Sequence, residues 1–305
     1  AQRLQDPGDL LVALISGGGS ALAEAPAAGG LEAVRSLNQE LMASGAPIGD
    51  INLIRRHRSR LKGGRLAAAA AGARQQSWIL SDMPPGDWYQ AASGPTTPDG
   101  TTPAEYAAAL RRWVPRFPAG GAPPAPRPGD ACFARAQWGL LADNHTACAA
   151  LAGSLRGDGR EPVEIDHASD ESDWPAAAAR LVQRWRELRA AHAGAALLAG
   201  GEGRVRLPAG AGTGGLNQQL ALAIALAMEG EAFTFFSAGT DGVDGNSHAA
   251  GACVTGATAG RIRAAGLDPA AHLRRCDATP ALAAAHALVE TGPTGNNLRD
   301  LRMFL

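Results

Sequence analysis

The chain has 305 residues, of which 46% are apolar and 19% charged, the composition of a globular protein long enough for two ordinary domains. The formal net charge of −1 gives no overall basic field, so we expect neither nucleic acid nor a membrane surface as a partner. The four cysteines lack metal-ligand spacing, and no apolar run reaches the length of a membrane span. Together these features favour a cytoplasmic location with reduced thiols.

The first half of the chain predicts two strands and two helices. Residues 10–15 are apolar without alternation, which predicts a fully buried strand of a parallel sheet. A helix is predicted over 31–43, and a second, alanine-rich helix over 64–74. Residues 77–82 predict another short buried strand. The proline- and glycine-rich stretch 115–130 is expected to form a surface loop or linker.

The second half repeats the order of strand, loop and helix. Helices are predicted over 145–156 and 175–193, and a strand followed by glycines over 194–202. Residues 212–228 read as a glycine loop and a helix, and 232–245 as a strand and an acidic loop, before a last strand closes the chain. This order predicts an α/β fold with mostly parallel strands, in which ligands bind at the carboxyl ends of the strands.

A glycine-rich loop, "SGGGS", follows the first predicted strand directly. It matches neither the dinucleotide-binding pattern nor the P-loop. Glycines allow backbone N–H groups to approach phosphate or carboxylate oxygens, but they also serve in plain tight turns. The residues alone leave both interpretations open for Ser16, Gly17, Gly18, Gly19 and Ser20.

The most basic stretch is "NLIRRHRSRLKGGRLA", residues 52–67, which holds Arg55, Arg65 and the only lysine, Lys62. It could be a solvated helix face or a nucleic-acid patch. However, no aromatic residue interleaves with the charges, and two adjacent glycines suggest a loop closing on an anion. Because arginine grips carboxylate and phosphate through paired hydrogen bonds, we favour anion binding.

Two acidic loops follow predicted strands. Asp82 and Asp87 lie in "SDMPPGDW" and could hold Mg²⁺ or act as a base, although turn and cap aspartates are common. The position of Asp82 at the end of a strand favours a functional role. Asp241 lies in "AGTDGVDGNSH", which could be a catalytic or metal loop or a glycine-rich turn.

Taken together, the chain resembles the bacterial glycerate 2-kinase family, whose members are also described as hydroxypyruvate reductases of tartrate degradation. The matching pieces cover nearly the whole chain in the family's order: "LISGGGSAL", "LNQELMASGAPIGDINLIRRHRSRLKGGRLA", "ILSDMPPGD", "ASGPTTPD", "GGLNQQLALAIALAM", "AGTDGVDG" and "ETGPTGNNLRDLR". The resemblance implies a Rossmann-like N-terminal domain, assigned to residues 1–190. It also implies a smaller α/β domain called MOFRL over 191–305, with the active site between the domains.

The activity implied is the ATP-dependent phosphorylation of D-glycerate at its 2-hydroxyl, giving 2-phosphoglycerate, with ATP and Mg²⁺ bound. The glycine loop would hold a phosphate or the carboxylate, while Arg55, Lys62 and Arg65 would neutralise charge. Asp82 would bind Mg²⁺ or accept the hydroxyl proton, with Asp87 as a second candidate metal ligand. Asp241 is a catalytic candidate from the second domain, and a homodimer is possible. The nucleotide side would comprise Glu202, Asn217, Gln218, Asp241, Thr294 and Asn296.

One departure from the family concerns the start of the chain. Family members usually carry a further N-terminal segment with a lysine-containing "GAGKA" loop, which has no counterpart here. We therefore expect either a fragment of a longer enzyme or a truncated binding remnant without turnover. An NAD(P)-dependent hydroxypyruvate reductase is the other alternative, and the lack of a dinucleotide-binding glycine motif argues against it.

Overall fold

The computed structural model describes residue 4 and residues 6–118, 120–167, 173–203 and 205–305. The chain forms two compact units, unit 1 (Ala1–Leu141) and unit 2 (Ala142–Leu305). The predicted domain boundary at residue 190 lies inside unit 2, and the assignment of the family domains to 1–190 and 191–305 stays a prediction. Within the described ranges, no helix is long and apolar enough to cross a membrane.

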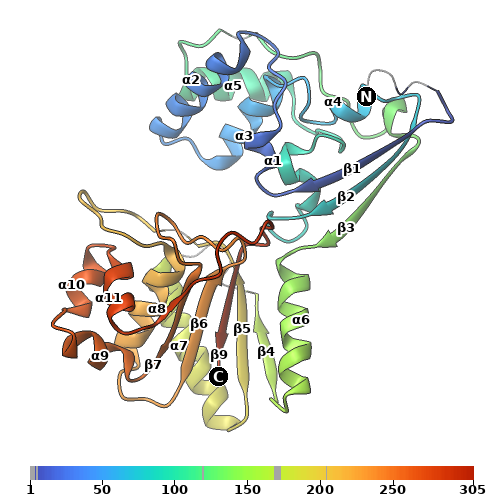
Figure 1. Ribbon diagram of the computed structural model, residues 1–305. Coiled ribbons are helices and arrows are strands. Elements are labelled where there is room, and N and C mark those ends of the chain that lie inside the picture. Colours follow the sequence, from blue (N-terminus) through green and yellow to red (C-terminus); the bar gives the residue numbers. More distant parts are fainter. Residues whose placement is uncertain (1–3, 5, 119, 168–172, 204) are drawn as a thin grey trace. The chain divides into compact units, whose positions relative to one another are not determined.

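Unit 1 contains a three-stranded sheet in the order β1-β2-β3 (Figure 1). β1 (Leu10–Ser16) pairs in parallel with β2 (Arg74–Leu80), and β3 (Ala136–Ala142) runs in the same direction beside β2. The strands predicted over 10–15 and 77–82 are therefore present, and parallel pairing holds in this unit. β1 lies at one edge of the sheet.

The expectation that residues 10–15 are fully buried is wrong. Side chains alternate along β1, so Ala13 and Ile15 are buried while Val12 and Leu14 are 52% and 78% exposed. The buried face packs against Ile79 of β2 and the short helix η1 (Trp88–Ser93). The opposite face is uncovered among the described residues, and a continuous apolar run cannot reveal which of its two faces is covered.

The helices of unit 1 build a second small core beside the sheet (Figure 1). The helix predicted over 31–43 is present as α2. The predicted helix 64–74 is shorter than expected, because after α4 the backbone makes i→i−3 turns from Ala67 to Ala73 before β2 begins. The predicted loop 115–130 has no helix or strand among its described residues. The helices are α1 (Gly19–Leu22), α2 (Gly30–Ala43), α3 (Ile48–His57), α4 (Arg65–Ala68), α5 (Pro103–Trp113) and the 3₁₀ helix η2 (Ala131–Phe133).

Unit 2 contains a six-stranded sheet in the order β4-β5-β9-β6-β7-β8. Only β4 and β5 pair in parallel; β9 lies antiparallel between β5 and β6, and the remaining pairs are antiparallel. The expectation of mostly parallel strands fails here because the last strand inserts into the middle of the sheet. The strands are β4 (Val163–Asp166), β5 (Ala196–Gly201), β6 (Thr234–Gly239), β7 (Gly251–Thr255), β8 (Leu288–Val289) and β9 (Asp300–Phe304).

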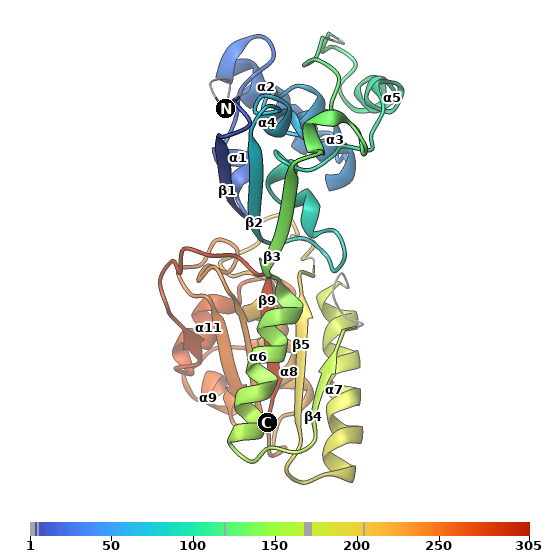
Figure 2. The same ribbon diagram turned by 90° about the vertical axis from the view of Figure 1, so that its right-hand side faces the viewer.

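Helices cover both faces of this sheet (Figure 2). α6 (Asn144–Gly157) packs on the face that carries Ala196 and Leu198 of β5. α7 (Trp174–Ala191) and α8 (Leu216–Ala227) pack on the face that carries Leu197. These three helices match the predicted ones. The smaller helices are α9 (Thr258–Ala264), α10 (Pro269–Arg274) and α11 (Ala278–Ala284).

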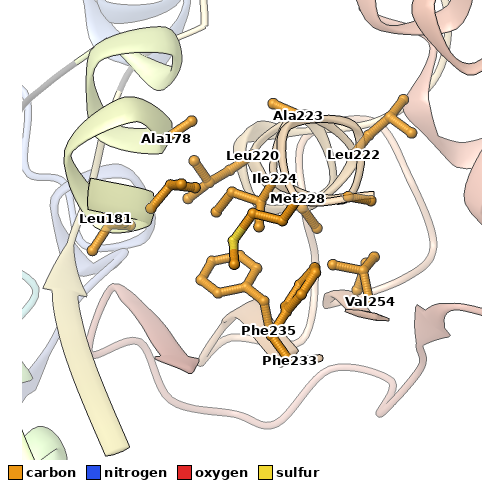
Figure 3. Packing of buried hydrophobic residues seen from close by; sticks show 14 of the residues in the cluster. Ala178, Leu181, Leu220, Leu222, Ala223, Ile224, Met228, Phe233, Phe235 and Val254 are labelled. Atoms are coloured by element: carbon orange, nitrogen blue, oxygen red, sulfur yellow. The ribbon is translucent and has the colours of Figure 1, made fainter. Parts of the chain in front are cut away.

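α8 is buried on all sides and forms the centre of the main core. Figure 3 shows Ile224 and Met228 above Phe233 and Phe235, with Val254 of β7 beside them. A helix that is apolar around its whole circumference is held in place by its neighbours rather than by one face. The N-terminal end of α8 is therefore a fixed point on which a site can be built.

Candidate functional site

The glycines of the unit 1 loop serve a turn and close packing contacts, and anion binding by the loop stays a prediction. A Cβ atom on Gly17 would lie 2.4 Å from Oδ2 of Asp82, so glycine is required for the backbone to approach that carboxylate. Gly18 has a φ of 79° and caps α1, which is the turn. A Cβ on Gly19 would lie 2.8 Å from Cβ of Ala92. The loop is thus pressed against both Asp82 and the segment around Ala92.

That segment is a feature that sequence reasoning missed. Ala92, Ser93 and Gly94 have φ values of 52°, 64° and 58°, a left-handed run that costs free energy for residues with a side chain. Oγ of Ser93 lies 2.7 Å from Oγ of Ser20, in the glycine loop. Strained backbone is concentrated at functional sites, and the motif "ASGP" offered only its glycine as a signal.

Two of the predicted cations lie beside the loop, in different environments. Nη2 of Arg55 donates a 2.8 Å hydrogen bond to the carbonyl oxygen of Ser20, which fixes the loop. Lys62 is fully buried, pairs with Glu24 and donates to the carbonyl oxygen of Ala23 at 3.2 Å. Burial lowers the pKa of both cations, against the charge of Glu24. Lys62 could contact a ligand only if its ion pair opened, so its catalytic role stays a prediction.

Arg65 is the third predicted cation and is also buried. Its Nε donates to the carbonyl oxygen of Pro123 at 2.9 Å, and its Nη1 donates to those of Lys62 and Arg56 at 2.9 and 3.1 Å. These bonds tie the basic stretch to the proline-rich loop. Its predicted role in charge neutralisation would therefore act through the electrostatic field rather than through contact.

The acidic candidates of unit 1 are close in sequence but differ in their surroundings. Asp82 lies half-buried against the backbone of Gly17, whereas Asp87 accepts a 3.3 Å hydrogen bond from the hydroxyl of Tyr89. Among the described residues, no group of three or more histidine, cysteine, aspartate or glutamate side chains could hold a metal ion. Mg²⁺ is commonly held by one or two carboxylates together with phosphate oxygens, so Asp82 offers a fitting donor.

We call the seven residues around this loop the glycine-loop cluster. It joins the ends of two adjacent parallel strands, where α/β proteins bind ligands. Two residues predicted for the site, Ser16 and Asp87, are not part of the cluster. Ser16 donates a 3.4 Å hydrogen bond to the carbonyl oxygen of Gly17. The cluster consists of Gly17, Gly18, Gly19, Ser20, Arg55, Asp82 and Ser93.

Unit 2 contains a cavity of about 520 Å³ near the N-terminal end of α8. Of the residues predicted for the nucleotide side, Glu202, Asn217 and Asp241 line it. The candidate loop "AGTDGVDGNSH" also places Asp244 and Asn246 on the cavity wall. Sequence reasoning missed Arg299 and Asp300, which lie just before β9 and at its start.

Three predicted residues do not line this cavity. Gln218 is fully buried, where it donates to Asp244 at 3.1 Å and accepts from the hydroxyl of Thr279 at 2.7 Å. Thr294 is exposed, and its N–H donates to the carbonyl oxygen of Asp241 at 3.0 Å. Asn296 is exposed and donates through its N–H to Oγ1 of Thr294 at 3.4 Å. These residues support the cavity wall, and direct nucleotide contact stays a prediction for them.

Asn217 is the centre of a buried hydrogen-bond network. Its Nδ2 donates to Oδ1 of Asp300 at 2.8 Å and to Oδ1 of Asp244 at 3.3 Å. Its Oδ1 accepts a 2.5 Å bond from Ser237 of β6. Both amide protons are therefore in use, so Asn217 positions the two carboxylates and has no amide proton left for a ligand.

Asp244 closes the N-terminal end of α8. It accepts the backbone N–H groups of Asn217 and Gln218 at 3.0 and 2.8 Å. Burial, together with the nearby charge of Asp300, outweighs these donors and raises the pKa of Asp244 to about 6. Asp244 is thus an acid that can change its protonation state close to neutral pH.

Two arginines accompany the acids of this cavity. Nη2 of Arg302, which is buried, donates to Oδ2 of Asp300 at 2.9 Å, and its Nη1 donates to the carbonyl oxygen of Gly200 at 3.4 Å. Nε of Arg299 lies 3.6 Å from Oε2 of Glu202. Carboxylates nevertheless outnumber guanidinium groups around the cavity, which favours cationic or hydrogen-bonding parts of a ligand.

Family comparisons match both ends of the chain. Residues 1–118 match the family model DUF4147, described as a domain of unknown function, and residues 195–300 match the MOFRL family. The first match contains the glycine-loop cluster, and the second contains most of the unit 2 cavity.

Relatives align with nearly the whole chain. A protein from Agrobacterium vitis named as a hydroxypyruvate reductase is 38% identical over 98% of this chain and 70% of its own length. A D-glycerate 2-kinase from Thermotoga maritima is 36% identical over 96% of this chain and 71% of its own length.

A solved structure also has the same fold. The crystal structure of glycerate kinase from Thermotoga maritima superimposes with a TM-score of 0.87 and 34% sequence identity, covering 100% of this chain and 75% of that one. The two families matched at the ends, the identity to whole-chain relatives and the shared fold agree with one another. The chain belongs to the glycerate 2-kinase family.

Proposed function

We propose that the protein catalyses the transfer of the γ-phosphoryl group of ATP to the 2-hydroxyl of D-glycerate, giving ADP and 2-phosphoglycerate. The observation that carries this proposal is the glycine-loop cluster in a chain 36% identical to a D-glycerate 2-kinase. Phosphoryl transfer asks the protein mainly for positioning and for neutralisation of negative charge. The backbone of the glycine loop could supply the first, and Arg55 and the buried Lys62 beside it carry positive charge for the second.

Each part of the cluster has a proposed role. The amides of the glycine loop would bind the glycerate carboxylate or a phosphate, with Arg55 holding the loop in shape. Asp82 would accept the proton of the 2-hydroxyl as its oxygen attacks the γ-phosphorus, or it would bind Mg²⁺. When bound, Mg²⁺ would neutralise charge on the phosphate oxygens. Asp82 is the residue for which both roles can be tested.

The nucleotide is proposed to bind in the unit 2 cavity. Its volume of about 520 Å³ lies in the range of small-molecule and cofactor sites. Glu202 and Asp241 on its wall could accept hydrogen bonds from the base or the ribose. That the protein acts in the cytoplasm and forms a homodimer stays a prediction.

The test compares two products in the same preparation. Incubation with ATP, Mg²⁺ and D-glycerate should release ADP only when D-glycerate is present. NADH oxidation with hydroxypyruvate, the reaction suggested by the name of the Agrobacterium vitis relative, should stay at background. Hydroxypyruvate-dependent NADH oxidation without ADP release would overturn the kinase assignment.

Calorimetry distinguishes an active kinase from a binding remnant without turnover. An active kinase should bind ATP and also release ADP. Heat of binding with ATP or D-glycerate, together with no ADP release, would identify the protein as a remnant that holds its ligands without reacting them.

A further inference from the structure

A second, smaller cavity lies in unit 1, beside the glycine-loop cluster and lined mostly by other residues. Its volume is about 210 Å³, roughly seven times the volume that one water molecule occupies in the liquid. It lies between the segment 89–94, the segment 97–101 and Arg56 of α3. Ser93 is the only lining residue that it shares with the glycine-loop cluster. We call it the Arg56 cavity.

The cavity wall carries a nearly buried ion pair with incomplete hydrogen bonding. Nε of Arg56 lies 3.3 Å from Oδ2 of Asp99, and the two side chains are only 12% and 4% exposed. The other oxygen of Asp99 is used, since it accepts from the N–H and the hydroxyl of Thr101 at 3.0 and 2.7 Å. Among the described residues, neither Nε of Arg56 nor Oδ2 of Asp99 completes a hydrogen bond.

The buried charges around the pair do not balance, because the other carboxylate in their field, Glu105, is exposed. Asp99 lies in the field of Arg65 as well as Arg56, so one buried carboxylate serves two guanidinium groups. Nη2 of Arg65 is buried without a hydrogen-bond acceptor in the described part of the chain. His57, which contacts Thr101 at 3.0 Å, adds little charge, because burial lowers its pKa from an ordinary value of 6.5. An excess positive charge in a half-buried place is stabilised by an anion.

The remaining wall suits a compact anion. Ser93 and Gln90 line the cavity, and the Ser93 hydroxyl also bonds to that of Ser20 at 2.7 Å. Gly63, Gly94 and Gly100 leave the space open, and a Cβ on Gly63 would lie 2.8 Å from Oδ2 of Asp99. A cavity of about 210 Å³ has room for a phosphate group.

We propose that the Arg56 cavity binds a phosphate group, held by the guanidinium group of Arg56 and by Ser93 and Gln90. Phosphate oxygens are good acceptors for the paired donors of arginine. This site is separate from the proposed catalytic site: Arg55 donates to the glycine loop, whereas Arg56, the next residue, faces the other cavity. Two adjacent arginines thus serve two anion sites.

The test titrates the full chain with inorganic phosphate by isothermal titration calorimetry. Arg56→Gln should weaken phosphate binding at least about tenfold, because it removes the charge and the paired donors. The exposed Arg60→Gln is the matched control and should leave this binding within about twofold. Unchanged binding in Arg56→Gln would overturn the proposal, and so would loss in Arg55→Gln alone, which would place the phosphate at the glycine loop.

A second variant keeps the ion pair intact in case Arg56→Gln fails to fold. Gln90→Glu adds a negative charge to the wall of the cavity without touching Arg56 or Asp99, and it should also weaken phosphate binding about tenfold. Equal affinity in Gln90→Glu and the unmodified protein would count against the site, as would no heat of binding in the unmodified protein. A parallel titration with methyl phosphate tells the two sources apart: tighter binding than inorganic phosphate points to a phosphorylated metabolite, and weaker binding points to free phosphate.

Discussion

The glycine-loop cluster of unit 1 and the cavity of unit 2 differ in charge: the cluster holds one cation and one carboxylate, Arg55 and Asp82, whereas the cavity is acidic. In unit 1 a single carboxylate, Glu24, serves both Arg55 and Lys62. In unit 2 four carboxylates line the cavity, and Arg299 is the only basic residue among the residues that line it in the described part of the chain. This difference in charge indicates that the two units suit different parts of a ligand. Unit 1 is suited to anionic groups, and unit 2 is suited to the neutral and hydrogen-bonding parts of a ligand.

The two regions are also held together differently. Unit 1 depends on close backbone approach, as where Gly17 lies against Asp82. Unit 2 depends on buried side chains that bond to one another, with Asn217 joining Asp244 and Asp300. A single substitution should therefore change catalysis in unit 1 and stability in unit 2.

The largest expected effect is on the stability of unit 2. Arg302→Met leaves Asp300 buried without its cation and should lower the free energy of unfolding by about 3–5 kcal/mol. Denaturant unfolding measures this loss. Arg184→Gln is the matched control, because Arg184 forms a partly exposed pair with Glu164 and its loss should lower the free energy of unfolding far less. Equal losses in the two variants would contradict the structural role of Arg302.

The next effect concerns catalysis in unit 1. Asp82→Asn should lower kcat at least about 100-fold, since the amide can neither accept the hydroxyl proton nor bind Mg²⁺ well. ADP release with saturating D-glycerate measures it, with circular dichroism to check the fold. Asp87→Asn is the control and should lower kcat less. Near-normal turnover in Asp82→Asn would show that Asp82 serves the turn and is neither the catalytic base nor a metal ligand.

Asp244 should make the stability of unit 2 depend on pH. Its pKa is raised from 3.8 to about 6 on folding, so the folded state binds a proton before the unfolded state does. The stabilisation is fully present below pH 3.8 and is lost as the pH rises through 6. Relative to Asp244→Asn, the unmodified protein should gain about 2 kcal/mol between pH 7.5 and 4.5. Parallel pH dependence of unfolding in the two proteins would rule this out.

The smallest effect tests close backbone approach. Gly17→Ala places a Cβ within 2.4 Å of the Asp82 carboxylate, which must move. We expect kcat to fall about tenfold, equivalent to about 1.4 kcal/mol in the barrier, with little loss of stability. Gly49→Ala in α3 has open space and should leave kcat unchanged. An active Gly17→Ala would show that the position of Asp82 is less critical than we propose.

The sequence predicts the parts of unit 1 whose signals are local. The strand before the glycine loop and the turn at Gly18 follow from apolar residues and glycines that are neighbours in the chain. That the glycine loop and Asp82 share one edge of the sheet follows from their places after parallel strands. The direct approach of Gly17 to the Asp82 carboxylate could not be predicted, because the two residues lie 65 positions apart. The left-handed conformation of Ala92 and Ser93 could not be predicted from residue type, because alanine and serine do not favour it.

The site in unit 2 was harder to predict for a topological reason. Asn217 was expected to face the ligand, but its partners Asp300 and Ser237 come from β9 and β6, and periodicity cannot show that these strands are neighbours. For Asp244, residue type leaves a catalytic or metal loop and a glycine-rich turn equally open. Its role appears only when the loop reaches the N-terminal end of α8.

The central position of β9 has a consequence for how the protein comes to be folded. β5 and β6 cannot join into one sheet until residues 300–304, which follow every other strand in the chain, arrive between them. During synthesis β5 and β6 each have an unpaired edge until β9 has been made. Pairing β5 with β9 then closes a loop of nearly a hundred residues. Pairings so distant in sequence form slowly, and open edges invite intermolecular association. Unit 2 should therefore depend on chaperones more than unit 1 does.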